Sequence, residues 1–271
     1  MTITAAIVGA TGTQGGSVLR ALHATGKYKL SALTRDVSSP SATKLKTEYP
    51  DVKLVEASVD DVESLKKAFK GNDFVFGMTT PVMPWLQDPK APLPADHEFK
   101  QGKNIADAAI ASGVKDIIFS SLYSIDKLSD GKYPGSNHFE NKDKTEKYIR
   151  SKSSEIRSAF IQLGFYMQNA VNFSHISPED NKTVIFTLPV KPTTKLPFVD
   201  AANDTGPVVS YMLDNFDEFA GKTMPVSGGY YEAQEIANAF TKVTGKPSRY
   251  VQIPAESLNN EDMEHMFKSY D

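Results

Sequence analysis

The sequence predicts an α/β protein built on a doubly wound parallel β-sheet. In the first half of the chain, short apolar runs alternate with helix-like segments about every 25 residues, as expected for strand–helix units with right-handed crossovers. A glycine-rich stretch, Gly9 to Val18, joins the first apolar run directly to the first helix-like segment. The second half is less regular, which indicates a smaller, discontinuous C-terminal α/β subdomain.

The first half is expected to contain five strands and four helices. The strands are Ile3–Val8, Lys29–Thr34, Lys53–Glu56, Phe74–Met78 and Ile117–Ser120. The helices are Ser17–Thr25, Ser41–Glu48, Val62–Phe69 and Glu98–Ser112. In the last helix, Ile105, Ala108 and Ala109 fall on one face at helical spacing, which predicts a side packed on the sheet.

The second half is expected to add one strand to this sheet and to form the subdomain. The expected elements are a helix at His138–Ser151, strands at Ser158–Leu163 and Tyr250–Ile253, and helices at Thr205–Leu213 and Glu232–Val243. The prolines of Phe186–Asp200 argue against a long helix or a central strand there. We therefore assign residues 1–150 to a nucleotide-binding domain and 151–271 to the last strand and the subdomain, with a return to the sheet near residues 200–228.

Composition excludes several classes of function. The net charge of -3 provides no basic surface for nucleic acid. No apolar run is long enough to span a membrane, and the first residues lack the features of a signal peptide, so we expect a cytoplasmic protein with possible access to the nucleus. Cysteine is absent, and the five histidines show no helical metal-binding pair, so we expect no metal site.

The stretch GATGTQGGSV raises a question, because each glycine inside a helix costs about 1 kcal/mol relative to alanine. Gly9, Gly12 and Gly15 lie three residues apart, between a strand and a helix. In that context the backbone can approach a pyrophosphate at the positive end of the helix dipole. A tight turn that binds nothing is the alternative. The spacing G-x-x-G-x-x-G resembles the short-chain dehydrogenase/reductase form of this fingerprint.

The end of the second strand indicates which dinucleotide is preferred. An acidic residue there would bind the ribose 2′-hydroxyl of NAD, whereas an arginine would accept the 2′-phosphate of NADP. The sequence LSALTRD places Arg35 at this position, and a guanidinium suits a phosphate. Asp36 follows and would either turn outward or pair with Arg35. NADP(H) is therefore favoured over NAD(H).

Several segments together resemble the NmrA-like family of atypical short-chain dehydrogenases/reductases, which includes transcriptional regulators and an NADPH-sensing relative. They are GATGTQGGSV, LTRD, QGKNIADAAIASGVKDIIFSSL, HFENK, PFVDAANDTGPVV and EIANAFTKVTGKPSRYVQIP. The resemblance covers the chain from Ile3 to about Pro254. It implies a Rossmann-type fold with NADP(H) bound at the carboxyl ends of the strands.

The resemblance also implies a set of contacts with NADP(H). The pyrophosphate would lie on Gly9, Thr11, Gly12, Thr13, Gln14 and Gly15, and the 2′-phosphate on Arg35. Ser58 takes the place of the family's adenine-side aspartate. Thr79, Thr80 and Lys142 would border the nicotinamide ribose, and Gly164, Phe165 and Tyr166 the nicotinamide ring. Core packing is the alternative for the two aromatic residues.

The catalytic set departs from that of active reductases, which use Tyr-x-x-x-Lys and a serine. Here the matching stretch is HFENK, so His138 replaces the tyrosine and Lys142 keeps the lysine position. An imidazole has an ordinary pKa near neutrality and is a possible acid. The usual serine position falls on Leu122.

Two functions from different classes follow. The first is an NADP(H)-binding redox sensor or regulator that acts on a protein partner. The second is an NADPH-dependent reductase of a small quinone, aldehyde or imine, with Met83, Trp85, Phe165 and Tyr166 around an apolar substrate. The chain would act as a monomer or a homodimer.

Overall fold

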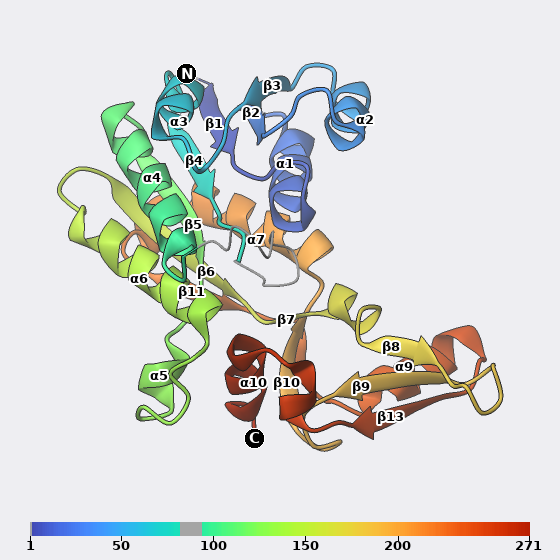
Figure 1. Ribbon diagram of the computed structural model, residues 1–271. Coiled ribbons are helices and arrows are strands. Elements are labelled where there is room, and N and C mark those ends of the chain that lie inside the picture. Colours follow the sequence, from blue (N-terminus) through green and yellow to red (C-terminus); the bar gives the residue numbers. More distant parts are fainter. Residues whose placement is uncertain (1, 82–93) are drawn as a thin grey trace. The chain divides into compact units, whose positions relative to one another are not determined.

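The structure, a computed structural model, describes residues 2–81 and 94–271, so Met83 and Trp85 lie outside the described residues (Figure 1). The chain forms two compact units. The first consists of Met1–Tyr123, Asn141–Gln162 and Ala201–Val226, and the second of Ser124–Glu140, Leu163–Asp200 and Ser227–Asp271. The sequence predicted a division at residue 150 with a return to the sheet near residues 200–228. The first unit continues to Gln162 and includes Ala201–Val226, and the second unit also contains Ser124–Glu140.

The first unit is built on a seven-stranded sheet of order β3-β2-β1-β4-β5-β6-β11. Its strands are β1 (Ile3–Ile7), β2 (Tyr28–Thr34), β3 (Lys53–Glu56), β4 (Phe74–Gly77), β5 (Asp116–Ser121), β6 (Arg157–Leu163) and β11 (Thr223–Val226). Strands β1 to β6 pair in parallel. Its helices are α1 (Thr13–Thr25), α2 (Pro40–Glu48), α3 (Val62–Phe69), α4 (His97–Ala111), α6 (Asn137–Ser151), α7 (Ala201–Asp214) and α8 (Phe216–Phe219). The first four residues of α6, up to Glu140, belong to the second unit. The Rossmann-type prediction is confirmed.

Alternation along the strands buries both faces of this sheet. Ala6, Val75 and Phe119 join one core cluster with side chains of α3, α4 and α6. Ala5, Phe76 and other strand residues outside that cluster are equally buried, and α1 and α7 lie on the opposite face (Figure 1). Helices on both faces explain why the strands read as nearly continuous apolar runs in the sequence.

Helix α1 begins earlier than predicted. The sequence analysis placed its start at Ser17, but the helix runs from Thr13 and includes two glycines. Buried Val18, Leu19 and Leu22 provide its apolar face. Packing of that face on the sheet outweighs the low helix propensity of glycine.

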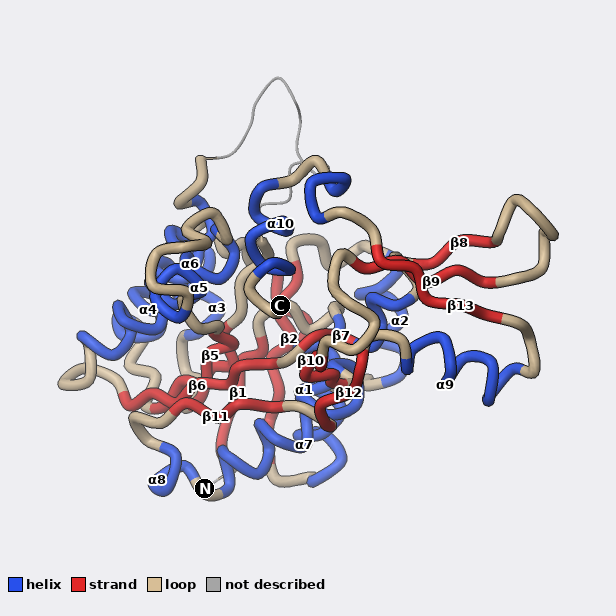
Figure 2. Tube along the Cα trace, turned by 90° about the horizontal axis from the view of Figure 1, so that it is seen from below, coloured by secondary structure: helices blue, strands red, loops and turns tan. Residues whose placement is uncertain are grey.

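The second unit contains two small sheets. Their strands are β7 (Phe165–Tyr166), β8 (Ser174–Ile176), β9 (Val184–Leu188), β10 (Lys195–Val199), β12 (Gly229–Glu232) and β13 (Ser248–Gln252). Their orders are β12-β10-β7 and β13-β9-β8. Helices α5 (Ile125–Leu128), α9 (Glu235–Thr244) and α10 (Glu261–Lys268) and the 3₁₀ turns η2 (Met167–Ala170) and η3 (Ala255–Leu258) complete it. Helix α9 lies along β9 and β13 (Figure 2).

One prediction for this unit is wrong. Strand β10 contains Pro197 and is nevertheless the central strand of its sheet. The pairing with β7 involves only Phe198 and Val199 and begins one residue after the proline. The missing N–H of Pro197 therefore leaves no hydrogen bond with β7 unmade. A proline is tolerated where the neighbouring strand has not yet begun.

Among the residues that the structure describes, no helix is both long and apolar enough to cross a bilayer.

Candidate functional site

The sheet order of the first unit identifies where a ligand would bind. Strand β1 lies between β2 and β4, so the winding direction reverses between β1 and β4. In open α/β sheets the ligand site lies outside the carboxyl ends of the strands at this switch point. The glycine-rich loop follows β1 and Thr79 follows β4, so both predicted segments lie at this edge of the sheet.

Two glycines of the loop are required by the turn itself. Gly9 has a φ of 67°, in the left-handed region that favours glycine. At Gly15, a Cβ atom would lie 2.3 Å from the carbonyl oxygen of Gly9 and 2.7 Å from that of Val8. The start of α1 therefore packs directly against the loop backbone.

The N-terminus of α1 is open to an anion. The N-cap residue is Gly12, whose amide donates to the Gly9 carbonyl at 2.9 Å and which has no side chain to cap the helix. The first turn contains no acidic residue, and Gly12 and Thr13 are exposed. The amides of a first helical turn have no acceptor within the helix and, together with the helix dipole, attract negative charge. This geometry suits a phosphate.

Arg35 is placed as the sequence suggested, at the residue after β2. Its side chain is exposed and has no hydrogen bond or ion pair with any residue of 2–81 or 94–271. Asp36 does not pair with it, because the Asp36 carboxylate accepts from the hydroxyl of Ser38 at 2.6 Å and from its amide at 2.7 Å. These hydrogen bonds, that of the hydroxyl first, lower the pKa of Asp36 below its ordinary value. The guanidinium is thus available to a phosphate.

The remaining predicted contacts on this edge differ in exposure. Ser58 is half-buried and its hydroxyl accepts from the amide of Asp60 at 3.2 Å. Thr80 is exposed, whereas Thr79 is buried and its hydroxyl donates to Glu98 at 2.7 Å. Contact of these residues with a cofactor remains a prediction.

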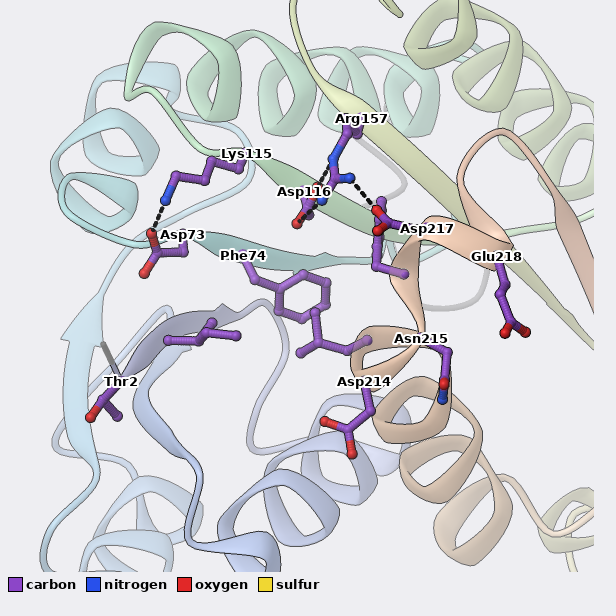
Figure 3. Close-up of a pocket in the computed structure, with 13 residues that line it drawn as sticks. Thr2, Asp73, Phe74, Lys115, Asp116, Arg157, Asp214, Asn215, Asp217 and Glu218 are labelled. Atoms are coloured by element: carbon purple, nitrogen blue, oxygen red, sulfur yellow. Dashed lines mark hydrogen bonds and ion pairs between the residues drawn. The ribbon is translucent and has the colours of Figure 1, made fainter.

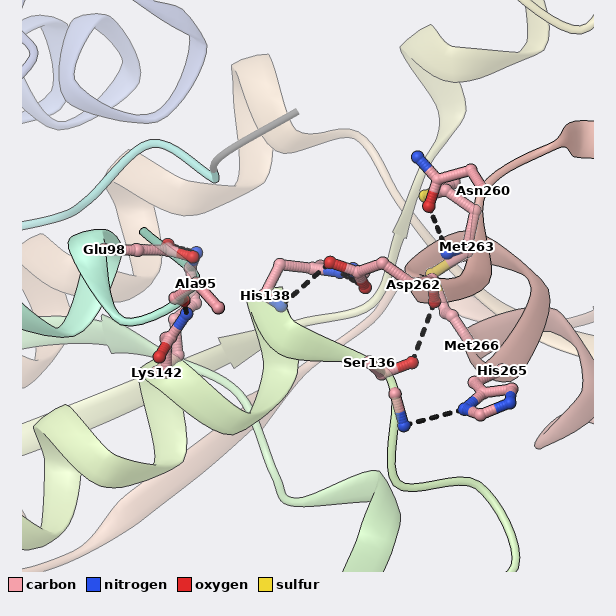
Figure 4. A network of polar contacts seen from close by, with 12 residues as sticks. Ala95, Glu98, Ser136, His138, Lys142, Asn260, Asp262, Met263, His265 and Met266 are labelled. Carbon is pink, nitrogen blue, oxygen red and sulfur yellow. Dashed lines mark hydrogen bonds and ion pairs between the residues drawn. The ribbon is translucent and has the colours of Figure 1, made fainter. Parts of the chain in front are cut away.

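Lys142 has a partner that the sequence analysis missed. Its ammonium donates to Oε1 of Glu98, in the first turn of α4, and both side chains are almost fully buried (Figure 4). Thr79 donates to the same oxygen. In this pair each buried charge compensates the other, whereas a single buried charge without a partner would be strongly unfavourable. The sequence carried no signal for it beyond an acidic residue early in a helix.

His138 also has a partner that sequence reasoning did not find. In the second unit, Asp262 of α10 pairs through Oδ1 with Nδ1 of His138 and accepts from its backbone amide at 3.2 Å through Oδ2 (Figure 4). Both side chains are about nine-tenths buried. A carboxylate on Nδ1 holds the proton there and orients the ring, leaving Nε2 as the exchangeable position.

Neighbouring contacts fix the same two segments of the second unit. The hydroxyl of Ser136 donates to the Asp262 carbonyl at 2.9 Å, and the amide of Gly135 donates to Nδ1 of His265 at 2.7 Å (Figure 4). The C-terminal helix α10 is thereby attached to the start of α6.

The predicted nicotinamide contacts Gly164, Phe165 and Tyr166 lie at the end of β6 and in β7. Phe165 is buried, with its ring centroid 5.6 Å from that of Phe198 and 6.0 Å from that of Phe267. A Cβ at Gly164 would lie 2.0 Å from the carbonyl oxygen of Pro197. Packing within the second unit therefore explains Gly164 and Phe165, and their contact with a cofactor remains a prediction.

A cavity of about 520 Å³ lies at the opposite edge of the first unit's sheet (Figure 3). It is lined by the starts of β1, β4, β5 and β6 and by the end of α7 with α8. Its charged groups largely pair with one another: Lys115 with Asp73 at 2.9 Å, and Arg157 with Asp116 and Asp217 at 2.6 Å. Hydrogen bonds from Lys115, and then from Thr4, lower the pKa of Asp73 to about 2. The amino ends of parallel strands are not where such sheets bind ligands, so we place the site at the glycine loop.

A sheet of this order, with a glycine loop and an uncapped helix at its switch point, defines a Rossmann-type protein. The chain belongs to the NmrA-like family, whose profile matches residues 1–271. It is 31% identical over 264 residues to an NmrA-like family domain-containing protein of Dictyostelium discoideum, covering 95% of this chain and 83% of that protein. It is 30% identical over 257 residues to the NmrA-like family domain-containing oxidoreductase ptmS of Penicillium ochrochloron, covering 91% of this chain and 75% of that protein.

Solved structures share the fold. NmrA, a negative transcriptional regulator, in complex with NADP superimposes with a TM-score of 0.79 at 23% identity, over 99% of this chain and 82% of that chain. The Escherichia coli NADPH-dependent quinone oxidoreductase QOR2, complexed with NADPH, gives 0.72 at 20% identity, over 98% of this chain and 87% of that chain. At these identities the likeness concerns the fold.

Proposed function

We propose that this chain binds NADP(H) at the glycine loop of its first unit. The observation that carries the proposal is Arg35, an exposed guanidinium without a partner among the described residues, at the end of the strand next to β1. The uncapped start of α1 would hold the pyrophosphate and Arg35 the 2′-phosphate. The solved relatives NmrA and QOR2, complexed with NADP and NADPH, support the choice of ligand.

Titration with NADPH and NADH tests this proposal. Arg35→Ala is expected to weaken NADPH binding by about 1.5–3 kcal/mol, the contribution of a hydrogen bond to a charged group, and to leave NADH binding unchanged. Arg35→Lys should fall between, because it keeps the charge but loses the fork. Lys44→Ala is the matched control, since it removes an exposed cation whose ion pair is with Glu48 on the same helix. Equal wild-type affinity for the two cofactors would refute the preference for NADP(H).

We propose further that the protein senses the redox state of this cofactor and reports it to a protein partner. The support is an intact glycine loop beside a catalytic set that lacks the tyrosine and the serine. The three serines near Leu122 have other surroundings. Ser121 donates to the carbonyls of Leu122 at 3.3 Å and Lys142 at 3.4 Å, and Ser124 donates to Glu140 at 2.8 Å. Ser120 is buried in β5.

A sensor must respond differently to the two redox forms, because a ligand shifts an equilibrium only through differential affinity. Hydrogen exchange should therefore differ between the NADPH-saturated and NADP⁺-saturated protein. Identical protection in both forms would refute the sensor function.

A second candidate is an NADPH-dependent reductase of a small quinone, aldehyde or imine, favoured by the pairing of His138 with Asp262. NADPH supplies a hydride, and the protein must then supply a proton or stabilise the charge. His138 lies one helical turn before Lys142 in α6. Asp262 would hold one proton on Nδ1 of His138, and Nε2 would donate the proton that the substrate needs. The printed name of ptmS, an oxidoreductase, agrees with this candidate.

NADPH oxidation with a panel of quinones and aldehydes separates the two candidates. Steady turnover that His138→Ala abolishes would establish the reductase and exclude a pure sensor. His175→Ala is the control, because His175 is exposed on β8 of the same unit. Absence of turnover with every acceptor by an NADPH-saturated protein would exclude a reductase of these substrates.

A further inference from the structure

Glu98, Lys142 and Thr79 form a buried polar cluster in the first unit. Their exposed fractions are 0%, 6% and 3%, and they come from the start of α4, from α6 and from the residues after β4. The Lys142 ammonium and the Thr79 hydroxyl both donate to Oε1 of Glu98. The cluster follows β4, one of the two strands at the switch point.

The cluster is not complete in itself. Oε2 of Glu98 is buried and has no hydrogen-bond partner among residues 2–81 and 94–271. The ammonium of Lys142 has three donors, and within the same residues only Glu98 accepts from it. An unpaired buried acceptor on a charged group is unfavourable, so a ligand that donates to it would gain affinity.

The two unused positions define the ligand chemistry. Oε2 of Glu98 can only accept, and the free hydrogens of Lys142 can only be donated. A pair of neighbouring hydroxyl groups satisfies both, because one hydroxyl donates to the carboxylate while the other accepts from the ammonium. A phosphate diester lacks the donor, and apolar groups lack both.

We propose that Glu98 is a cofactor-binding residue that accepts a hydrogen bond from the diol of the nicotinamide ribose of NADP(H). This inference rests on the proposed binding of NADP(H), and it assigns Glu98 a direct contact in addition to its pairing with Lys142. In NADP(H) the adenosine ribose carries the 2′-phosphate, so the nicotinamide ribose holds the vicinal diol. A carboxylate at this point would also discriminate against ligands without the second ribose.

The test compares adenosine 2′-phosphate 5′-diphosphate with 2′-phospho-ADP-ribose, which adds that ribose and, because the terminal phosphate becomes a diester, carries about one negative charge less. We expect calorimetry on the wild-type protein to show tighter binding of the ligand with the second ribose. Glu98→Gln retains the shape but presents an amide donor, and it is expected to remove that gain, at least tenfold, while the shorter ligand binds as before.

Glu146→Gln is the matched control. The Glu146 side chain is 12% exposed, pairs with Arg150 and accepts from Thr223, and its Oε2 likewise has no partner among the described residues. Glu146 lies one turn of α6 beyond Lys142, beside β11 instead of β4. This control should preserve the difference between the ligands. Circular dichroism confirms that each variant is folded.

The outcomes separate the two proposals. Equal wild-type affinity for the two ligands, or an undiminished gain in Glu98→Gln, would overturn the role of Glu98 while leaving NADP(H) binding intact. Failure of the folded wild-type protein to bind either ligand or NADPH would overturn the proposed function and this inference with it. The wild-type comparison needs no variant, so the inference can be refuted even where Glu98→Gln does not fold.

Discussion

Gly15→Ala and Gly16→Ala are neighbouring substitutions in α1, and only Gly15→Ala should lower the stability of the protein markedly. An alanine Cβ at position 15 would lie 2.3 Å from the carbonyl oxygen of Gly9, 2.5 Å from its carbonyl carbon and 2.7 Å from the oxygen of Val8. All three are backbone atoms of the glycine loop, which cannot rotate away as a side chain can. At position 16 the nearest atom, the Ala10 oxygen, is 3.3 Å away.

The magnitudes follow from these distances. Overpacking costs about 1–3 kcal/mol, and three backbone contacts place Gly15→Ala at the upper end. Alanine regains about 1 kcal/mol of helix propensity, so we expect a net loss of about 2 kcal/mol. Gly16→Ala gains the same propensity and has one tight contact, 3.3 Å from the Ala10 oxygen, so its effect on stability should be close to zero.

Thermal unfolding followed by circular dichroism measures the difference. The midpoint of Gly15→Ala should fall by about 4–8 °C, whereas that of Gly16→Ala should change little. If Gly15→Ala unfolded at or above the temperature of Gly16→Ala, the close packing of α1 on the loop would be refuted.

Three other predictions concern pairs of polar groups. Asp262→Asn should lower the unfolding midpoint and shift the proton of His138 between its ring nitrogens, visible in ¹⁵N spectra; an unchanged tautomer would argue against the pairing. Asp73, with its pKa of about 2, stabilises the fold above pH 4, and this contribution should disappear as the pH falls from 4 to 2. Solvent screening limits this contribution to the free energy of unfolding to about 1 kcal/mol. The stability of Asp73→Asn should therefore not show this loss when the pH is lowered from 4 to 2. Burial and then the hydrogen bond to Asp214 raise the pKa of Tyr28. Absorbance titration should therefore show this phenol ionising above the ordinary value of 10, and the protein should lose stability as the pH rises past 10. An ordinary pKa for Tyr28 would contradict its hydrogen bond to Asp214.

The sequence predicted the first unit well because its elements are set by local patterns. The strand Lys53–Glu56 and the helix Val62–Phe69 have the predicted bounds. Helix α2 also forms as predicted, because Ser39 accepts from the amide of Ala42 at 3.3 Å and Pro40 occupies the first turn. Apolar periodicity and helix caps are visible without a partner.

Sequence reasoning located the candidate site only where a single segment of the chain carries the signal. The loop and Arg35 are recognisable from spacing and flanking strands, and Lys142 is recognisable from the family resemblance of HFENK. Glu98 and Asp262 are not, since each gains its role from a partner 44 or 124 residues away. Strand β10 was missed for a related reason, because the rule against proline in central strands depends on where the neighbouring strand begins.

The first unit combines segments that the ribosome makes early with a segment, Ala201–Val226, that it makes late. The seven-stranded sheet lacks its last strand until Val226 has been synthesised, and α7 supplies the amide of Gly206 that donates to Ser17 of α1 at 2.9 Å. A nascent chain ending near residue 150 would expose the uncovered face of α1. The first unit therefore has to mature after most of the protein has emerged, and a truncated N-terminal half should be a poor substitute for it.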